Sequence, residues 1–478
     1  LDSKGKPIDE AWAQERMKNE PLTEIKQVKG TSETTPALSP NDEFASFELM
    51  NYLIGIDNSF SKPNGSYIRQ AFQNGLAMQA ASGYNPYKMG VVGAGDSHNT
   101  ATNYSQSNYF GDHAMLDPTP EVRLSGKVAS GMTVLETGTS GLGGVWAEEN
   151  TRESIYDAMQ RREVFGTSGV RLKIRMFGGW GYDKDILKKS DWVDKAYAGG
   201  VPMGGDLSRA NGKAPSFIVW ALKDPVDGNL DRIQIVKGWT KDGQIFEKIF
   251  DVVWSGDRKL DSVTGKLPPV GNTVDISNAS YTNDIGAVEL KTVWTDPEFD
   301  ANQHAFYYAR ALQIPTPRWS TFDAKKLGVT PPGSVAATIQ ERAWSTPIWY
   351  TPTEAEAAKV KSGLTVADLL KGGAKPLGDD DLKSLVVGKN LAVSNTVTGE
   401  TTSVLFGENG QRVDSAIDND THSVTSSSAS YEIKDGHIVT TVEHTPFELT
   451  VYRFGDKYVA ARSNEFGHAN YELKVAAK

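Results

Sequence analysis

A carboxylate and an imidazole stand one residue apart, directly after a short apolar run. The apolar residues 89–92 and the small residues 93–95 are followed by Asp96 and His98. On a regular strand, residues i and i+2 share a face, so both side chains could reach one ion. This pair suits Zn²⁺, Mn²⁺ or Fe²⁺ and predicts a metal site at the C-terminal end of a buried strand. The alternative is a turn in which Asp96 binds backbone amides and His98 faces solvent.

Two glutamates and a second histidine could complete such a site. Glu24 and Glu33 flank residues 26–32, and either carboxylate could bind a metal or orient a ligand from behind it. We expect Glu24 to bind the metal and Glu33 to contact the substrate. Each could equally be an ordinary surface residue. His113 follows His98 by 15 residues on an expected loop, where it could move a proton or contact substrate. A plain loop histidine is the alternative.

A glycine-rich segment and an arginine are candidates for the substrate side of the site. Residues 138–150 match neither G-x-S-x-G nor G-x-G-x-x-G, so we interpret them as a substrate-side loop. Trp146 and Glu148 could line a pocket there, and Asn150 could contact substrate. Trp146 could instead pack on the helix that follows, and Asn150 could cap it. Arg171 could grip an anionic group by a forked contact, or it could pair with a carboxylate within the protein.

The elements that must position these residues are both helical and extended. Half-buried residues 24–28 and the run 89–94 predict strands, and apolar spacing predicts helices over 41–56 and 66–82 between them. The order strand–helix–helix–strand is typical of α/β proteins. Residues 150–164 form the clearest expected helix.

The second half of the chain has a different pattern. Short alternating runs from about 215 to 350, separated by Gly, Asp, Asn and Pro, predict an antiparallel β-sandwich. All 11 tryptophans lie at or before Trp349, and all 9 methionines at or before Met203. We therefore expect three domains, over residues 1–210, 211–352 and 353–478. The last should be a small α+β domain.

Composition narrows the function classes. The net charge of −10, without a long basic block, argues against nucleic-acid binding through a basic face. No run of about 18 or more apolar residues is present, so no membrane span is expected. The chain has no cysteine, which excludes disulfides, thiolate catalysis and cysteine-ligated metals. A cysteine-free chain suits an oxidising compartment, so we expect a periplasmic or secreted protein.

Several segments, in the same order, resemble the DUF3604 proteins of the PHP (polymerase and histidinol phosphatase) superfamily. The segments are residues 24–34, 39–48, 85–99, 145–171, 314–324 and 344–352. The resemblance implies a distorted (β/α)7 barrel in which histidines and carboxylates hold a multinuclear cluster of divalent ions that activates water to cleave phosphoester-like bonds. It also implies that Asp96 and His98 match the last metal-binding motif, and that Glu24 lies at the end of an inner strand near the site.

The chain departs from that superfamily in its histidines. PHP proteins begin with a His-x-His strand and continue through a Thr-Asp-His-like motif, whereas the first histidine here is His98. We therefore expect the C-terminal portion of such a protein, with a missing N-terminal segment as a possible partner. The expected fold class is α/β plus β: a partial PHP-type barrel, an antiparallel β-sandwich and a small C-terminal α+β region.

The expected function is metal-dependent hydrolysis of a small anionic ester, with a phosphoester favoured. Hydrolysis of a sulfate ester or an amide on the same barrel is one alternative. A non-catalytic protein is another, because tryptophans and tyrosines of the β-rich half could bind a carbohydrate or a cell surface. Exposed rows of aromatic side chains would favour binding, and a cleft that joins Glu24, Asp96 and His98 would favour hydrolysis.

Overall fold

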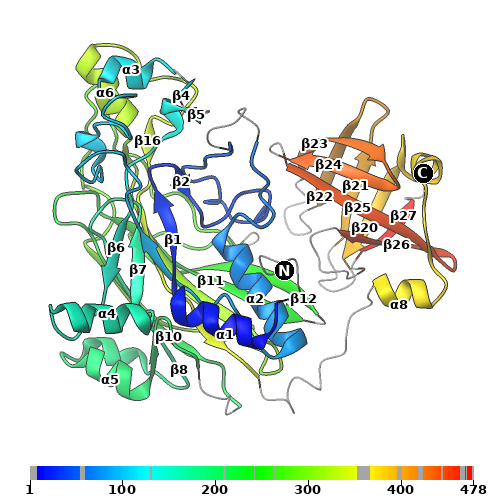
Figure 1. The fold of residues 1–478 in the computed structure, drawn as a ribbon, viewed down its shortest axis with the longest axis horizontal. Coiled ribbons are helices and arrows are strands. Elements are labelled where there is room, and N and C mark those ends of the chain that lie inside the picture. The colour runs from blue at the N-terminus through cyan, green and yellow to red at the C-terminus, as the bar shows by residue number, and fades with distance from the viewer. Residues whose placement is uncertain are drawn as a thin grey trace.

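The computed structural model contains helices and strands in both halves of the chain, which confirms the mixed fold class (Figure 1). It describes residues 8–53, 60–126, 128–129, 132–207, 212–241, 243–262, 265–352, 366–395, 401–417, 424–442, 445–462, 469 and 471–475.

A small sheet near the N-terminus carries the Asp96 and His98 motif at one end. Its central strand β1 (Leu22–Gln27) lies parallel to β3 (Gly90–Gly93) and antiparallel to β2 (Gly30–Thr31). The connection to β3 includes α2 (Ile68–Ser82), which buries Phe72 and Leu76 on one face. The strands and the helix predicted over 24–28, 89–94 and 66–82 are therefore present.

The helix predicted over 41–56 is wrong where the structure describes it, because residues 41–50 form turns. Asp42 accepts a hydrogen bond from the backbone N–H of Phe44 (3.0 Å) and also binds Arg310 across the fold. Such side-chain bonds compete with helical hydrogen bonds. Residues 54–56 lie outside the described part of the chain.

Two antiparallel sheets enclose the main core. The larger contains β12 (Gln244–Trp254), β11 (Leu230–Lys241), β14 (Ala305–Gln313), β17 (Arg342–Ser345), β7 (Val164–Thr167) and β6 (Leu142–Val145), with β18 (Ile348–Tyr350) also on β14. The smaller contains β13 (Glu289–Thr295), β10 (Ser216–Leu222), β8 (Lys173–Gly179) and β9 (Gly200–Pro202). Alternate residues such as Ile174, Phe217 and Ile233 fill the space between the two sheets.

The N-terminal segment covers the other face of the larger sheet. Ile25 on β1, Phe72 on α2 and Val91 on β3 pack against Phe306 and Trp349 of that sheet. The larger sheet is thus the middle of three layers. Both sheets take strands from either side of residue 210, and the domain boundaries at 210 and 352 stay predictions.

Shorter elements complete this part of the chain. They are α1 (Glu10–Asn19), η1 (Gln106–Asn108), α3 (Pro120–Leu124), β4 (Val128–Ala129), β5 (Met132–Thr133), η2 (Val134–Glu136), α4 (Arg152–Gln160), η3 (Lys184–Lys188), α5 (Trp192–Gly199), β15 (Thr316–Pro317), α6 (Trp319–Leu327) and β16 (Thr338–Ile339). The expected helix over 150–164 is α4, and Thr151 rather than Asn150 caps it by accepting a hydrogen bond from Ser154 N–H.

The C-terminal region forms a barrel-like closed sheet, drawn from yellow-orange to red in Figure 1. Its strands are β20 (Asn390–Asn395), β21 (Thr401–Phe406), β22 (Gln411–Ile417), β23 (Val424–Lys434), β24 (His437–Val442), β25 (Thr445–Phe454), β26 (Lys457–Arg462) and β27 (Tyr471–Val475). Each strand pairs with the next, and β20 pairs with β27, so the sheet closes on itself. β19 (Lys375–Pro376) adds to β25, and α8 (Val366–Lys371) and α9 (Asp379–Val386) precede the closed sheet.

A PHP-type (β/α)7 barrel is not shown. Among the strands that the structure describes, β1 and β3 are the only parallel pair. The described helices also include none with the length and apolar composition needed to cross a bilayer.

Candidate metal centre

The end of β3 is fixed tightly against the larger sheet. A Cβ on Gly93 would lie 2.7 Å from both the backbone nitrogen of Leu142 and the carbonyl oxygen of Thr167, so only glycine fits there. Beyond Gly93, backbone hydrogen bonds from Ala94 to Lys26 and from Val28 to Gly95 extend the β1–β3 pairing. The position from which Asp96 and the following residues leave the sheet is therefore fixed by backbone contacts.

Asp96 leaves this edge in a left-handed conformation, with φ = 48°. It is not on a strand, so the premise that Asp96 and His98 share a strand face does not hold. Its carboxylate lies 2.7 Å from the ammonium of Lys29 and is about half exposed. Partial burial would raise the pKa of Asp96, but the hydrogen bond and charge of Lys29 outweigh it and lower the pKa.

The loop after His98 returns to place Asp112 and His113 beside it. The backbone N–H of His98 donates to the carbonyl oxygen of Asp112 (2.8 Å), and His98 forms a parallel bridge with His113. The two imidazole rings meet edge to face with centroids 3.9 Å apart. One ligand atom from each of His98, Asp112 and His113 lies within 4.8 Å of the others, which is close enough to bind one ion.

Asp112 has a buried carboxylate that a bound cation would stabilise. It is 3% exposed, and neither of its carboxylate oxygens has a hydrogen bond; the buried Nδ1 of His113 also lacks one. The nearest positive charge is the Lys29 ammonium, at 3.7 Å from Oδ2. Burial raises the pKa of Asp112, and the charges of Lys29 and the two histidines offset only part of that effect. Since buried polar atoms are normally satisfied, a metal ion fits this donor set.

The carboxylate of Asp117 positions Asp112 and His113 from behind. It accepts hydrogen bonds from the backbone N–H groups of Asp112 (2.8 Å) and His113 (2.7 Å). Gly111 precedes them with φ = 91°, and a Cβ there would lie 2.4 Å from the Asp117 carbonyl oxygen. The loop is therefore preorganised by local contacts.

Glu24 lies on β1 at the same edge of the sheet, in register with Val92. Burial is the main cause of its raised pKa; a hydrogen bond with Gln27 opposes the rise, and the negative charge of Asp96 adds to it. Glu24 and Asp96 are thus electrostatic neighbours, although neither is part of the His98–Asp112–His113 group.

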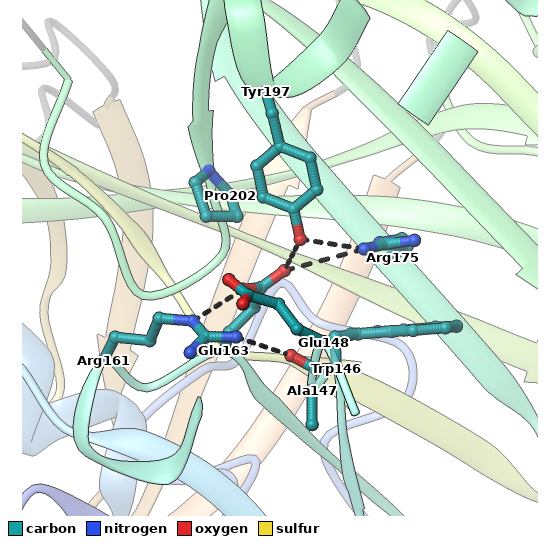
Figure 2. A pocket seen from close by; sticks show the side chains of 8 residues that line it. All are labelled: Trp146, Ala147, Glu148, Arg161, Glu163, Arg175, Tyr197 and Pro202. Atoms are coloured by element: carbon teal, nitrogen blue, oxygen red, sulfur yellow. Dashed lines mark hydrogen bonds and ion pairs between the residues drawn. The ribbon is translucent and has the colours of Figure 1, made fainter. Parts of the chain in front are cut away.

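Trp146 and Glu148 line a separate pocket of about 420 Å³ (Figure 2). The lining includes the buried carboxylate of Glu163, which binds Arg161 (3.1 Å), accepts a hydrogen bond from Tyr197 and lies 3.7 Å from Arg175. The side chain of Trp146 also packs into the protein, because its Nε1 donates to the carbonyl oxygen of Ile174.

This pocket lies at the other end of β3 from His98. Gly90, at the start of β3, approaches Val164, whereas Gly93, at its end, approaches Leu142. Because Val145 pairs with Val164 on the adjacent strands, Trp146 follows the edge near Gly90. The structure therefore does not bring Trp146 and Glu148 to the His98–Asp112–His113 group.

Asn150 and Arg171 belong neither to the His98–Asp112–His113 group nor to the pocket lining. Asn150 is exposed before α4 and does not line the pocket. The guanidinium of Arg171 pairs with Asp224 at 3.2 Å, and its backbone N–H binds the same carboxylate at 2.8 Å. The hydrogen bond and charge of Asp224 raise the pKa of Arg171. For Arg171, the alternative of an internal ion pair matches the structure.

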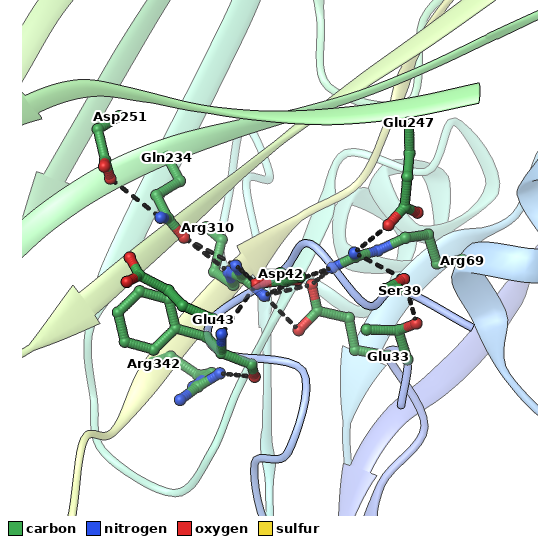
Figure 3. Close-up of polar contacts among 12 residues, drawn as sticks. Glu33, Ser39, Asp42, Glu43, Arg69, Gln234, Glu247, Asp251, Arg310 and Arg342 are labelled. Atoms are coloured by element: carbon green, nitrogen blue, oxygen red, sulfur yellow. Dashed lines mark hydrogen bonds and ion pairs between the residues drawn. The ribbon is translucent and has the colours of Figure 1, made fainter. Parts of the chain in front are cut away.

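Glu33 is buried in an ion network that joins the N-terminal layer to the larger sheet (Figure 3). Its carboxylate accepts hydrogen bonds from Arg69 (2.6 Å), Tyr308 (2.6 Å), Arg310 (3.1 Å) and Trp344 (2.7 Å). Burial alone would raise the pKa of Glu33, but Arg310 and Arg69 lower it to about 2. Both oxygens of the Glu33 carboxylate thus bind side chains of the protein itself.

Two residues at this site, Asp112 and Lys29, were not predicted from the sequence. Asp112 adjoins His113, so the Asp-His pair was the available signal. Lys29 lies between Glu24 and Glu33 in the sequence, but its neighbours there are typical of a surface lysine.

The comparisons with known proteins agree with the resemblance at the family level. A search of curated proteins found no match. The model of the DUF3604 family, described as a protein of unknown function, matches residues 1–352 of the 478. That match includes β1, β3 and every residue of the candidate metal centre. The chain therefore belongs to the DUF3604 family.

Proposed function

We propose that this protein is a metal-dependent hydrolase that cleaves a small anionic ester, with a phosphoester as the favoured substrate. The observation that carries the proposal is the His98–Asp112–His113 group, in which a buried carboxylate without a hydrogen bond faces two imidazoles. Placement in the PHP superfamily belongs to the same proposal and rests on the resemblance of the sequence.

His98, Asp112 and His113 would hold a divalent ion. Two imidazoles and one carboxylate suit Zn²⁺, Mn²⁺ or Fe²⁺, and the exposure of His98 leaves one side open for water and substrate. A bound divalent ion lowers the pKa of a coordinated water and polarises an ester oxygen. His113 is thereby reassigned from proton transfer to metal binding.

Asp96 and Glu24 offer further carboxylates at the same edge of the sheet. They would serve a second ion in a multinuclear cluster. Sulfate-ester and amide hydrolysis remain alternatives on the same site. A periplasmic or secreted location stays a proposal that only the absence of cysteine supports.

The aromatic residues favour this proposal over carbohydrate or surface binding. All 11 tryptophans are buried or half-buried, and Trp319, Trp344 and Trp349 are almost fully enclosed in the core. Binding platforms for sugars need aromatic faces in contact with solvent. A row of exposed indoles is absent, since all tryptophans lie in the described part of the chain.

Metal binding tests the proposal directly. Chelator-treated protein is titrated with Zn²⁺ or Mn²⁺, and turnover is assayed with aryl phosphate, phosphodiester and sulfate esters. His98→Ala, His113→Ala and Asp112→Asn should each weaken metal affinity by about tenfold or more and lower turnover in parallel.

His437→Ala is the matched control, because this histidine binds Thr450 in the closed sheet and should leave metal affinity unchanged. Wild-type metal affinity in both Asp112→Asn and His113→Ala would rule out the proposed site.

A further inference from the structure

Lys29 places one positive charge between two carboxylates of the metal centre. Its ammonium lies 2.7 Å from Asp96 Oδ2, 3.0 Å from the Asp96 carbonyl oxygen and 3.7 Å from Asp112 Oδ2. The side chain is only 12% exposed, so it has little freedom to turn into solvent. The Lys29 side chain is thus mostly buried and is held in place by its contacts with Asp96.

The backbone fixes Lys29 in this position. The turn between β1 and β2 is held by a hydrogen bond from Lys29 N–H to the side-chain oxygen of Gln27 (3.1 Å). The next residue, Gly30, has φ = 103°, and a Cβ on it would lie 2.5 Å from the carbonyl oxygen of Glu48. Only glycine adopts this turn without strain, so the direction of Lys29 follows from the fold.

A divalent ion on Asp112 would have this ammonium as a close neighbour. Two positive charges a few ångströms apart repel strongly in a partly buried site, and they also compete for the same carboxylate. The hydrogen bonds to Asp96 keep Lys29 at the rim when the contact with Asp112 is given up. An anionic ester bound to the ion would then lie close to this ammonium.

Resting on the proposed hydrolase, we propose that Lys29 has two linked roles. It is an internal cation that competes with the metal for Asp112, and it binds a charged oxygen of the substrate once the metal is in place. The residue therefore lowers metal affinity while it raises affinity for an oxyanion. These opposite effects distinguish it from a residue that only supports the fold, because loss of structure would weaken both kinds of binding.

The test compares Lys29→Met with the wild type in two calorimetric titrations. Chelator-treated Lys29→Met should bind Zn²⁺ at least about tenfold more tightly, because no ammonium opposes the ion. The Zn²⁺-loaded variant should bind inorganic phosphate about tenfold more weakly. Lys29→Arg keeps the charge and should stay near the wild type in both titrations.

Lys248→Met is the matched control, since Lys248 lies on β12, pairs with Glu298 and has no contact with the metal centre. Unchanged or weaker Zn²⁺ binding in Lys29→Met, or unchanged phosphate binding, would overturn the role of Lys29. If Lys29→Met does not fold, Lys29→Gln is measured against the same expectations.

His113→Ala separates this result from failure of the proposed function. If Zn²⁺ binding depends on His113 but not on Lys29, only the role of Lys29 is wrong. If Zn²⁺ binding is absent or unaffected by His113→Ala, the metal site is wrong and the role of Lys29 falls with it.

Discussion

The two aspartates beside His98 and His113 have opposite surroundings. Asp96 is half exposed and paired with Lys29, whereas Asp112 is buried and has no hydrogen bond to its carboxylate. A carboxylate with a close ion pair and contact with solvent gains less from a metal than a buried carboxylate without a hydrogen bond. This contrast moves the centre of the site from Asp96 to Asp112.

Some of the candidate site residues lie together in the structure, and others do not. Asp96, His98, His113 and Glu24 do gather at one edge, because β1 and β3 run parallel and end together. Asp112 was not predicted, because the adjacent Asp-His pair does not reveal that this carboxylate is buried without a hydrogen bond. Glu33 was predicted as a substrate contact, but its partners Arg69, Arg310 and Trp344 are far away in sequence.

Glu33 makes acid stability a test at the residue scale. Its pKa of about 2 in the folded state lies below the ordinary value of 4.5, so its stabilising effect is complete above pH 4.5. That effect is lost as the pH falls from 4.5 through 2, because the unfolded chain then binds the proton more readily.

We therefore expect Glu33→Gln to be less stable than the wild type by about 3 kcal/mol at pH 7, with the difference shrinking toward pH 2. Urea unfolding at pH 7, 4 and 3 measures it. Glu149→Gln, on an exposed loop, should differ little at any pH. A Glu33→Gln penalty that stays constant with pH would contradict the expectation.

Packing between elements decides where the metal-centre loop begins. β3 is short, and its last residue, Gly93, touches the backbone of both β6 and β7. A substitution here acts on the site through the position of the strand rather than through any ligand.

Gly93→Ala should therefore destabilise the protein by about 1–3 kcal/mol and weaken Zn²⁺ binding, because its Cβ meets backbone atoms that cannot move aside. Gly95→Ala is the matched control two residues further on, where the nearest atom to a Cβ is a serine hydroxyl at 3.6 Å. Thermal unfolding and Zn²⁺ titration of both variants give the comparison. Equal behaviour of the two would show that the contact with the larger sheet does not set the loop.

A helix or strand could be predicted where its own apolar spacing determines its structure. It could not be predicted where contacts with residues far away in the sequence determine it. α2 follows its apolar spacing closely. The segment after Pro40 has comparable spacing, yet Asp42 and Glu48 serve Arg310 and Arg318 on the far side of the fold. Those long-range ion pairs override the local preference for a helix.

At the scale of the whole molecule, closure of the C-terminal sheet could not be predicted. Each hairpin between neighbouring strands is a local event that alternation and turns can indicate. The closing pair of β20 and β27 joins Leu391 to Val475, which are 84 residues apart in the numbering. Such non-local pairing leaves no periodic signal in the sequence.

The distribution of tryptophans makes the two parts of the molecule separately observable. Because every tryptophan lies at or before Trp349, indole fluorescence reports on the layered part alone, whereas far-UV circular dichroism also reports on the closed sheet. Leu382 of α9 is fully buried in the core of the closed sheet with Val404 and Val451.

Leu382→Ala should cost the closed sheet about 2–5 kcal/mol, because it opens a cavity among these side chains. The dichroism transition should move to lower urea, while indole fluorescence and Zn²⁺ affinity stay at wild-type values. Leu405→Ala, at an exposed position of the same sheet, should leave both transitions in place. A parallel shift of the fluorescence transition in Leu382→Ala would instead mean that the closed sheet and the metal-centre layers unfold as one cooperative unit.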